Sequence, residues 1–200
     1  MKLYCATTNQ GKLREFRLAL ERFSGNWIEP APLAEMDKIP VCEEHGYTFE
    51  ENAIEKALYY SRYAPGLLMA EDSGLEVDAL NGEPGVRSAR FAGTGKDEDN
   101  NRLLLEKLKH VDNRNARYVC VVALAEHGRL LATFRGAVAG WIAEAPRGTN
   151  GFGYDPLFIY PPYGRTFGEA SPEEKLAVSH RARALAQMVN WLRQNGGSRK

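Results

Sequence analysis

The sequence predicts an α/β fold, and two patterns indicate it. Near the start, a strand pattern over residues 2–7 leads through a polar, glycine-containing turn into a helical pattern over residues 13–20. Farther on, the apolar run 67–70 is typical of a buried strand and is followed at once by Glu71-Asp72-Ser73-Gly74. Open α/β sheets bind their ligands where strands end. The acidic segment is therefore the first candidate for a functional site.

Composition limits the kind of partner. Lys plus Arg balance Asp plus Glu at 26 each, so the chain lacks the basic excess of a nucleic-acid-binding protein. Two hundred residues form one domain or two closely associated lobes. Three cysteines without metal-binding spacing favour a reducing compartment. The start is too short and too soon polar for a signal peptide, and no apolar run reaches transmembrane length. We expect a cytoplasmic protein that binds neither nucleic acid nor membrane.

The remaining helices are expected to begin at polar caps, which are Thr48, Asp97, Ser171 and Ser179. Thr48 and Ser171 are each followed three residues later by Glu, which makes a capping box. The helix after Thr48 should end near residue 62. A polar tail begins at Asn195.

The remaining strands are expected from apolar or alternating segments, at 27–29, 75–80, 117–125, 129–134, 136–142 and 156–160. Prolines at positions 30, 32 and 40 should break the segment after the first of these strands. His127-Gly128 is typical of a hairpin turn, and three consecutive strands around it favour an antiparallel section.

The turn Thr7-Thr8-Asn9-Gln10-Gly11-Lys12 has the geometry of a phosphate-binding site. Backbone N–H groups at a helix start and the positive end of the helix dipole attract anions, and Lys12 adds a point charge. The segment is neither a Walker sequence nor a dinucleotide fingerprint. The alternative is a plain helix cap by Thr8 or Asn9.

Four other segments carry candidate chemistry, and the first three have a plainer alternative. Glu71-Asp72-Ser73-Gly74 could be a simple turn between two strands, and the acidic loop 42–46 could be solvated. The glycine-rich loop 146–156 offers aromatic rings for stacking a base, or is a surface loop with its aromatics in the core. His180 and Arg181 lie in the first turn of a helix, where cations oppose the dipole and suggest an anionic or polar ligand.

Six motifs in order give a resemblance over essentially the whole chain. They are Thr8-Asn9-Gln10-Gly11-Lys12-Leu13-Arg14-Glu15, Thr48-Phe49-Glu50-Glu51-Asn52-Ala53, Glu71-Asp72-Ser73-Gly74-Leu75, Pro84-Gly85-Val86-Arg87-Ser88-Ala89-Arg90, Gly151-Phe152-Gly153-Tyr154-Asp155-Pro156 and Glu174-Lys175 with Ser179-His180-Arg181. The chain resembles the inosine triphosphate pyrophosphatase family. Each motif is weak alone, but six in order at matching spacing are specific.

The resemblance implies a single domain over residues 1–200, with a long mixed β-sheet, flanking helices and two lobes around a nucleotide-binding cleft. It implies a homodimeric enzyme that uses Mg²⁺ to hydrolyse ITP, dITP or XTP to the monophosphate and pyrophosphate. Asp72 matches the general base and a metal ligand, and Glu44 matches a second metal ligand, with Glu43 as its rival. The positions that match substrate-binding residues are Thr7, Thr8, Asn9, Gln10, Gly11, Lys12, Ser73, Phe152, Gly153, Tyr154, Asp155, Lys175, His180 and Arg181.

Two positions depart from the family pattern. Many bacterial relatives have Asp-Asp where this chain has Glu71-Asp72, and many have tyrosine where Arg87 stands. The first departure makes a metal-binding role for Glu71 doubtful, and the second could alter substrate contacts or only the surface. Two other functions stay open: a pyrimidine or methylated-nucleotide pyrophosphatase, and a non-catalytic nucleotide-binding module.

Overall fold

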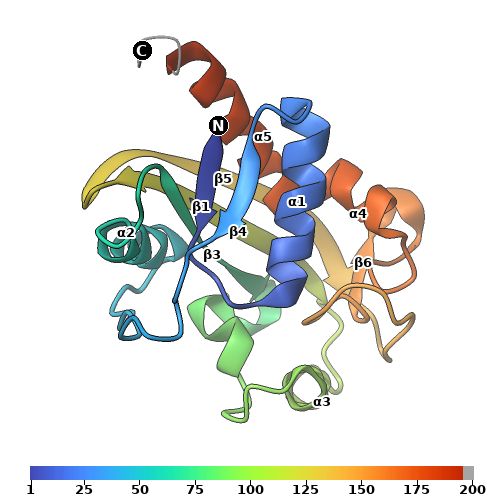
Figure 1. Cartoon of the computed structure of the whole chain (residues 1–200). Coiled ribbons are helices and arrows are strands. Elements are labelled where there is room, and N and C mark those ends of the chain that lie inside the picture. Colours follow the sequence, from blue (N-terminus) through green and yellow to red (C-terminus); the bar gives the residue numbers. More distant parts are fainter. Residues whose placement is uncertain (196–200) are drawn as a thin grey trace. The chain divides into compact units, whose positions relative to one another are not determined.

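A seven-stranded mixed β-sheet with flanking helices forms the fold (Figure 1). The computed structural model describes residues 1–195, so the polar tail that follows lies outside the described part. The strand order is β2-β1-β3-β4-β5-β6-β7. β1 pairs in parallel with β2 and β3, whereas β6 pairs antiparallel with β5 and β7. The expected α/β class with a mixed sheet is confirmed.

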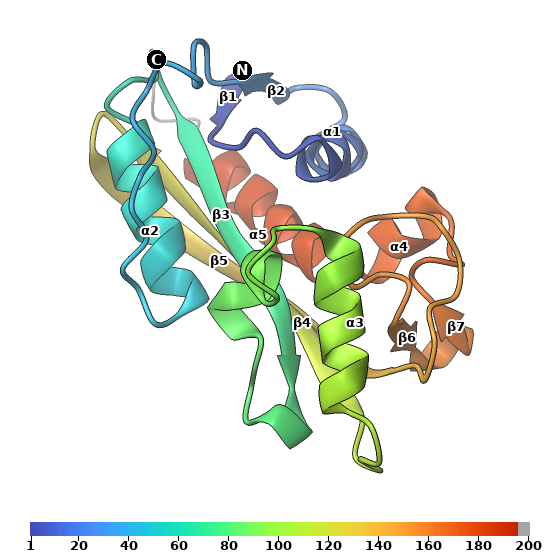
Figure 2. The ribbon, with the colours of Figure 1, turned by 90° about the horizontal axis from the view of Figure 1, so that it is seen from below.

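The strands are β1 (Lys2–Cys5), β2 (Glu29–Pro32), β3 (Leu68–Val77), β4 (Asn115–Glu126), β5 (Arg129–Ile142), β6 (Phe158–Tyr160) and β7 (Arg165–Thr166). Figure 2 shows the long strands β3, β4 and β5. His127 and Gly128 both have positive φ and join β4 to β5, as the sequence predicts for a hairpin turn.

The helices are α1 (Gln10–Ser24), α2 (Phe49–Tyr60), α3 (Asp97–Lys107), α4 (Pro172–Val178) and α5 (His180–Asn195), with short 3₁₀ turns at Asp78–Leu80, Gly85–Arg90 and Pro161–Tyr163. Both capping boxes form as expected, at Thr48 and at Ser171. Asn9 caps α1 by accepting a hydrogen bond from the Lys12 amide at 3.0 Å. None of the described helices is long and apolar enough to cross a membrane.

The chain divides into two compact units. Within the described residues, unit 1 comprises residues 1–72, 120–136 and 180–195, and unit 2 comprises residues 73–119 and 137–179. Strands β3, β4 and β5 contribute residues to both units. Two units agree with the two lobes that the family resemblance implies.

Helices α1 and α5 pack against each other in unit 1 (Figure 1). The apolar stripe of α1 is buried, with Phe16 and Leu20 at its centre, and α5 buries Leu185 and Met188. In unit 2 the core gathers side chains from β3, α3, β4, β5 and the chain after the glycine-rich loop, including Leu75, Leu104, Tyr118, Phe158 and Phe167.

The alternative of a simple turn at residues 71–74 is wrong, and so is the expected break between two strands there, because β3 runs through these residues without interruption. Gly74 favoured a turn in the sequence pattern, because glycine is typical of turns. In the fold, a Cβ at this position would lie 2.6 Å from the Gly85 carbonyl oxygen, so Gly74 permits a close approach of backbone to the strand. The strand expected to reach residue 80 ends at Val77.

The prediction of two separate strands at 129–134 and 136–142 is also wrong, again because a glycine lies inside a strand. β5 is one strand through Gly136, where a Cβ would lie 2.0 Å from the carbonyl oxygen of His180. The strand expected at 27–29 lies instead at 29–32 and includes two prolines, which an edge strand tolerates. Lys96, and not Asp97, occupies the N-cap position of α3.

Candidate functional site

Asp72 is a buried carboxylate on β3 that is held by two side chains of α2. Its Oδ2 accepts a hydrogen bond from Asn52 Nδ2 at 3.2 Å, and its Oδ1 lies 3.0 Å from the Lys56 ammonium. Asn52 and Lys56 are four residues apart on the helix and therefore project from the same face. Helix α2 thus fixes both oxygens of the carboxylate.

Lys56 also contacts Glu44, whose Oε2 lies 3.2 Å from the same ammonium nitrogen. Glu44 and Asp72, 28 positions apart in sequence, therefore converge on one cation. Glu43 instead lies 3.4 Å from Nε2 of His45, and both side chains are largely exposed. The structure favours Glu44 over Glu43 as the partner of Asp72.

The electrostatic environment raises the pKa of Asp72 above its ordinary value. Burial is the largest cause, and together with the negative charges of Glu44 and Glu71 it outweighs the opposing influence of Lys56 on this pKa. Burial lowers the pKa of Lys56, but Asp72 and Glu44 more than compensate and keep the ammonium charged. A raised pKa suits a carboxylate that must accept a proton near neutral pH.

Glu71 lies at the centre of a second, more deeply buried set of charges. Its Oε1 is 2.8 Å from the Lys12 ammonium and 3.3 Å from the Arg181 guanidinium. Arg181 also pairs with Glu15 of α1, and the thiol of Cys120 donates to Glu71 at 3.4 Å. Burial raises the pKa of Glu71, but Lys12 and Arg181 outweigh it and hold that pKa well below its ordinary range.

This arrangement changes the interpretation of Arg181. The sequence suggested that a cation in the first turn of α5 awaits an anionic ligand. In the structure Glu15 and Glu71 supply two carboxylates to its guanidinium, and the Arg181 side chain is 3% exposed. The protein itself therefore offsets the unfavourable interaction with the helix dipole. His180, the first residue of α5, is also buried.

The turn before α1 lies in unit 1, as does Glu71. The plain helix cap forms at Asn9, and the Lys12 side chain extends to the buried Glu71 carboxylate. Thr7 Oγ1 accepts from the Asn9 amide at 3.2 Å. Thr8, Asn9 and Gln10 are exposed, and Thr7, Gly11 and Lys12 are partly exposed.

A separate group of predicted residues comes together in unit 2. Asp155 is 1% exposed and accepts hydrogen bonds from Lys175 Nζ at 2.5 Å, the Phe152 amide at 2.9 Å and the Tyr118 hydroxyl at 3.2 Å. The Lys175 ammonium lies 5.1 Å from the centre of the Phe152 ring, within cation–π distance. Phe152 is partly exposed.

The other members of this motif differ in exposure. Tyr154 is buried, and its hydroxyl donates to the Ser88 carbonyl at 2.8 Å, so its side chain belongs to the core. Gly153 is bound through its backbone to α3. Ser73 follows Asp72 in β3 and is half-buried.

A divalent cation fits the pair formed by Glu44 and Asp72. Two carboxylates already hold a positive group, the Lys56 ammonium, at hydrogen-bond distance. Within residues 1–195 no group of three or more His, Cys, Asp or Glu side chains is placed to hold a metal. Mg²⁺ is commonly bound by one or two carboxylates together with substrate phosphates and water, so two protein ligands suit it.

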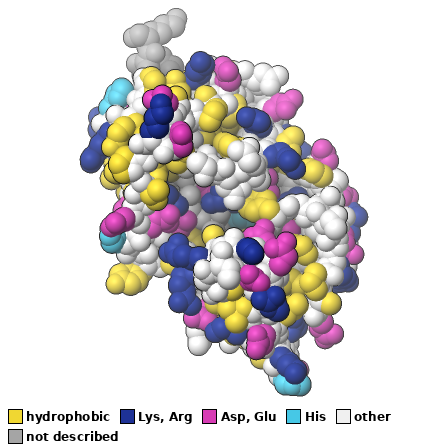
Figure 3. All heavy atoms as spheres, turned by 60° about the horizontal axis from the view of Figure 1, so that its bottom comes forward, with side chains coloured by type: hydrophobic (Ala, Val, Ile, Leu, Met, Phe, Trp, Pro, Cys, Tyr) yellow, Lys and Arg dark blue, Asp and Glu magenta, His cyan; other side chains and the backbone are white. Residues whose placement is uncertain are grey.

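Charged and apolar side chains mix on one face of the molecule. Figure 3 shows acidic, basic and apolar side chains interspersed on the face that it displays. This mixture matches the formal net charge of zero.

Comparison with known proteins supplies the family. A family model described as the Ham1 family matches residues 3–191. The chain belongs to the Ham1 family. The family resemblance drawn from the six motifs is therefore confirmed.

Curated relatives in the Ham1 family cover nearly the whole chain. A dITP/XTP pyrophosphatase of Exiguobacterium sp. is 48% identical over 189 residues, covering 94% of this chain and 95% of that protein. A dITP/XTP pyrophosphatase of Acidobacterium capsulatum is 47% identical over 199 residues, covering 94% of this chain and 97% of that protein.

Solved structures of Ham1 proteins share the fold. The Ham1 protein of Staphylococcus aureus matches with a TM-score of 0.84 and 38% identity, covering 97% of this chain and 99% of that one. A HAM1 protein from Coxiella burnetii matches with a TM-score of 0.85 and 40% identity, with the same coverage.

Sequence reasoning missed several residues of the site. Lys56 and Asn52 lie on the helix that Thr48 caps, and their spacing of four residues was the available signal. Glu15 and Cys120 gave no local signal, because they reach Arg181 and Glu71 through contacts distant in sequence.

Proposed function

We propose that this chain is a magnesium-dependent pyrophosphatase of non-standard purine nucleoside triphosphates. It would hydrolyse ITP, dITP or XTP to the nucleoside monophosphate and pyrophosphate. The names of its Ham1 relatives support the reaction. The observation that carries the proposal is that the Glu44 and Asp72 carboxylates both contact the Lys56 ammonium. Next to them, the side chains of Lys12 and Arg181 pair with Glu71.

Asp72 is the proposed general base. Water adds to a phosphorus of the α–β anhydride, the bridging P–O bond breaks, and the proton of the water passes to the Asp72 carboxylate. Asn52 and Lys56 hold both oxygens of that carboxylate, which fixes the direction in which it accepts the proton. Its raised pKa supports this role.

Glu44 and Asp72 are the proposed ligands of Mg²⁺. When bound, the metal supplies positive charge that offsets the charge developing on the phosphate oxygens. Lys12 and the N–H groups at the start of α1 would bind the triphosphate, with Thr7, Thr8, Asn9, Gln10 and Gly11 forming the turn. Lys56 is a further cation within unit 1 that a polyphosphate would attract.

We assign the binding of the purine base to a set of hydrogen-bond donors and to one aromatic ring. Inosine and xanthine carry a carbonyl where adenine has an amino group, so a pocket of donors favours them. His180 and the N–H groups at the start of α5 are such donors. Arg181 pairs with two carboxylates, so we assign it a smaller direct part in recognising the carbonyl of the base. Phe152 supplies the stacking face, and the Asp155–Lys175 pair orients it.

Incubation with ITP and Mg²⁺, with pyrophosphate as the readout, tests the reaction. We expect release from ITP and XTP and about ten-thousand-fold lower catalytic efficiency on ATP. Asp72→Asn should abolish turnover and keep much of the ITP affinity, whereas Asp78→Asn, an exposed aspartate just after β3, should not change activity. Near wild-type turnover in Asp72→Asn would remove Asp72 as the base. Release from a pyrimidine triphosphate and not from ITP would favour the pyrimidine alternative.

A neighbouring pair of glutamates tests the metal assignment. Glu44→Gln should weaken Mg²⁺ binding. Titration calorimetry in the presence of a non-hydrolysable triphosphate measures this binding. Glu43→Gln should leave it unchanged, because the Glu43 side chain is 84% exposed and pairs with His45. Weaker Mg²⁺ binding in Glu43→Gln than in Glu44→Gln would assign the metal to Glu43.

We also propose a homodimer in a reducing cytoplasm. The dimer rests on family analogy, and light scattering that gave a monomer mass at micromolar concentration would contradict it. The three cysteines are all unpaired thiols, which supports the compartment.

A further inference from the structure

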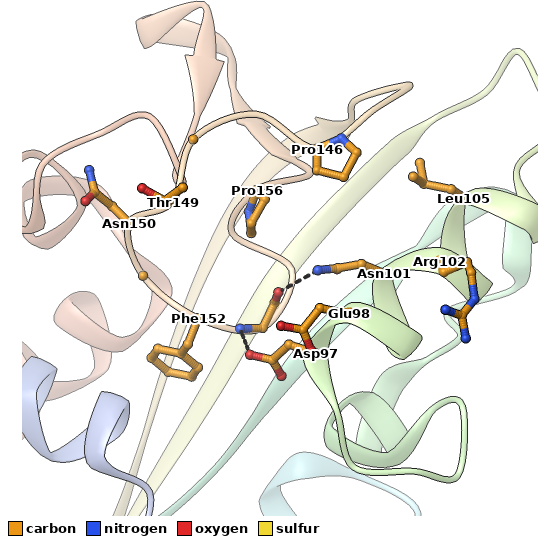
Figure 4. A pocket seen from close by; sticks show the side chains of 13 residues that line it. Asp97, Glu98, Asn101, Arg102, Leu105, Pro146, Thr149, Asn150, Phe152 and Pro156 are labelled. Atoms are coloured by element: carbon orange, nitrogen blue, oxygen red, sulfur yellow. Dashed lines mark hydrogen bonds between the residues drawn. The ribbon is translucent and has the colours of Figure 1, made fainter.

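Helix α3 holds one residue of the glycine-rich loop by both of its backbone polar groups. The Gly153 N–H donates to Asp97 Oδ2 at 2.6 Å, and Asn101 Nδ2 donates to the Gly153 carbonyl at 3.1 Å (Figure 4). Asp97 and Asn101 are four residues apart, so they project from one face of α3 on successive turns. We call this pair of contacts the α3 clamp.

The clamp is a specific contact within unit 2. Asn101 is 8% exposed, which is unusual for an amide side chain on a surface helix. Asp97 accepts as a carboxylate, and charge-assisted hydrogen bonds are the stronger kind. Both residues line a pocket of about 450 Å³ together with Phe152 and Pro156 (Figure 4). The clamp therefore fixes one wall of this pocket.

Phe152 lies between two fixed points of the loop. On one side, the Gly153 peptide groups are bound to α3. On the other, the Phe152 amide donates to Asp155, which Lys175 and Tyr118 hold in place. Gly153 has a φ of +63°, in the left-handed region that glycine adopts readily, so the chain can turn between these anchors. Side-chain hydrogen bonds therefore hold the backbone at Phe152 and at the residue that follows it.

We propose that Asp97 and Asn101 are positioning residues for recognition of the purine base. They hold Gly153 so that Phe152 presents its ring in a fixed orientation, and Gly153 itself contributes its N–H and C=O to α3 rather than to substrate. This role rests on the proposed function, in which Phe152 stacks on the base. A displacement of about 1 Å at a binding group can lower efficiency about a hundredfold, so an indirect contact of this kind has a measurable effect.

Steady-state kinetics on ITP tests the role. Asp97→Ala and Asn101→Ala should each raise KM about tenfold, with kcat changed by less than about threefold, because one hydrogen bond is lost and the catalytic carboxylate is untouched. Asp97→Asn keeps an acceptor and should restore most of the affinity. Asp99→Ala is the matched control, since Asp99 lies in the same helical turn but bonds to Thr94 and Arg102.

Hydrogen–deuterium exchange of residues 150–156 supplies a readout besides activity. The Gly153 amide should exchange faster in Asp97→Ala than in Asp99→Ala, and binding of inosine monophosphate, measured by calorimetry, should weaken in parallel. Faster exchange with unchanged binding of the monophosphate would overturn the positioning role. An equal loss of kcat with constant KM would overturn it too. A wild-type protein that neither binds nor cleaves inosine nucleotides would instead overturn the proposed function.

Should Asn101→Ala fail to fold, Asn101→Asp has the same shape and replaces the donor by an acceptor facing the Gly153 carbonyl. We expect it to raise KM at least as much as Asp97→Ala. A wild-type KM in a folded Asn101→Asp protein would refute the clamp.

Discussion

Replacing Glu71 by glutamine should destabilise unit 1 severely, although the two side chains have nearly the same shape. The Glu71 side chain is 2% exposed and lies 2.8 Å from the Lys12 ammonium and 3.3 Å from the Arg181 guanidinium. Glutamine removes the negative charge and leaves the buried Arg181 with one carboxylate partner fewer. The variant therefore tests whether the buried charges act as one unit.

The distances give the magnitude. With an effective dielectric constant of about 20, a unit charge at 2.8 Å interacts by about 6 kcal/mol and one at 3.3 Å by about 5 kcal/mol. The cost of burying these charges offsets much of that gain, and removing one partner of a buried pair destabilises by about 3–5 kcal/mol. Total stabilities are about 5–15 kcal/mol, so the loss is a large fraction of the whole.

Urea unfolding at neutral pH measures the effect, with thermal unfolding as a second probe. A loss of this size should lower Tm by about 6–20 °C in a chain of this length. Glu76→Gln is the matched control on the same strand, because Glu76 pairs with the half-exposed Arg117 and such pairs contribute about 0–1 kcal/mol. A loss in Glu71→Gln no greater than in Glu76→Gln would refute the reasoning.

Three further predictions follow from single residues. Gly136→Ala should destabilise by about 1–3 kcal/mol or more, seen in urea unfolding, because its Cβ would lie 2.0 Å from the His180 carbonyl oxygen; wild-type stability would show that α5 can shift. In the native protein a thiol reagent should modify Cys42, which is partly exposed, and leave the two buried cysteines unmodified until unfolding; labelling of all three in the folded state would contradict the structure. Lys12→Ala should weaken tripolyphosphate binding about 10- to 100-fold in calorimetry and nucleoside binding far less, and an equal loss of both would indicate a folding defect.

Local chemistry explains which features could be predicted from the sequence. The caps at Thr48 and Ser171 depend on residues three positions apart, and the hairpin at His127-Gly128 on two adjacent residues. Each of these features depends only on residues that are close together in the sequence. The same holds for the sequence motifs that identified the family.

Long-range packing explains which features were missed. Gly74 and Gly136 have the composition of strand breaks, but each lies inside a strand because another segment approaches its α-carbon closely. Likewise, the pairing of Arg181 with Glu15 joins residues that nothing in the local pattern connects. A single sequence carries no record of such approaches until the fold is known.

The division of unit 1 into three chain segments affects how the protein is made on the ribosome. Helix α1 is complete at Ser24, but its packing partner α5 begins at His180 and ends at Asn195. At about 5–20 residues per second, synthesis of the intervening chain takes roughly 10–30 s. During that interval the apolar face around Phe16 and Leu20 has no α5 to cover it. We expect nascent chains stalled before residue 180 to bind chaperones through α1, and full-length chains to be released from them.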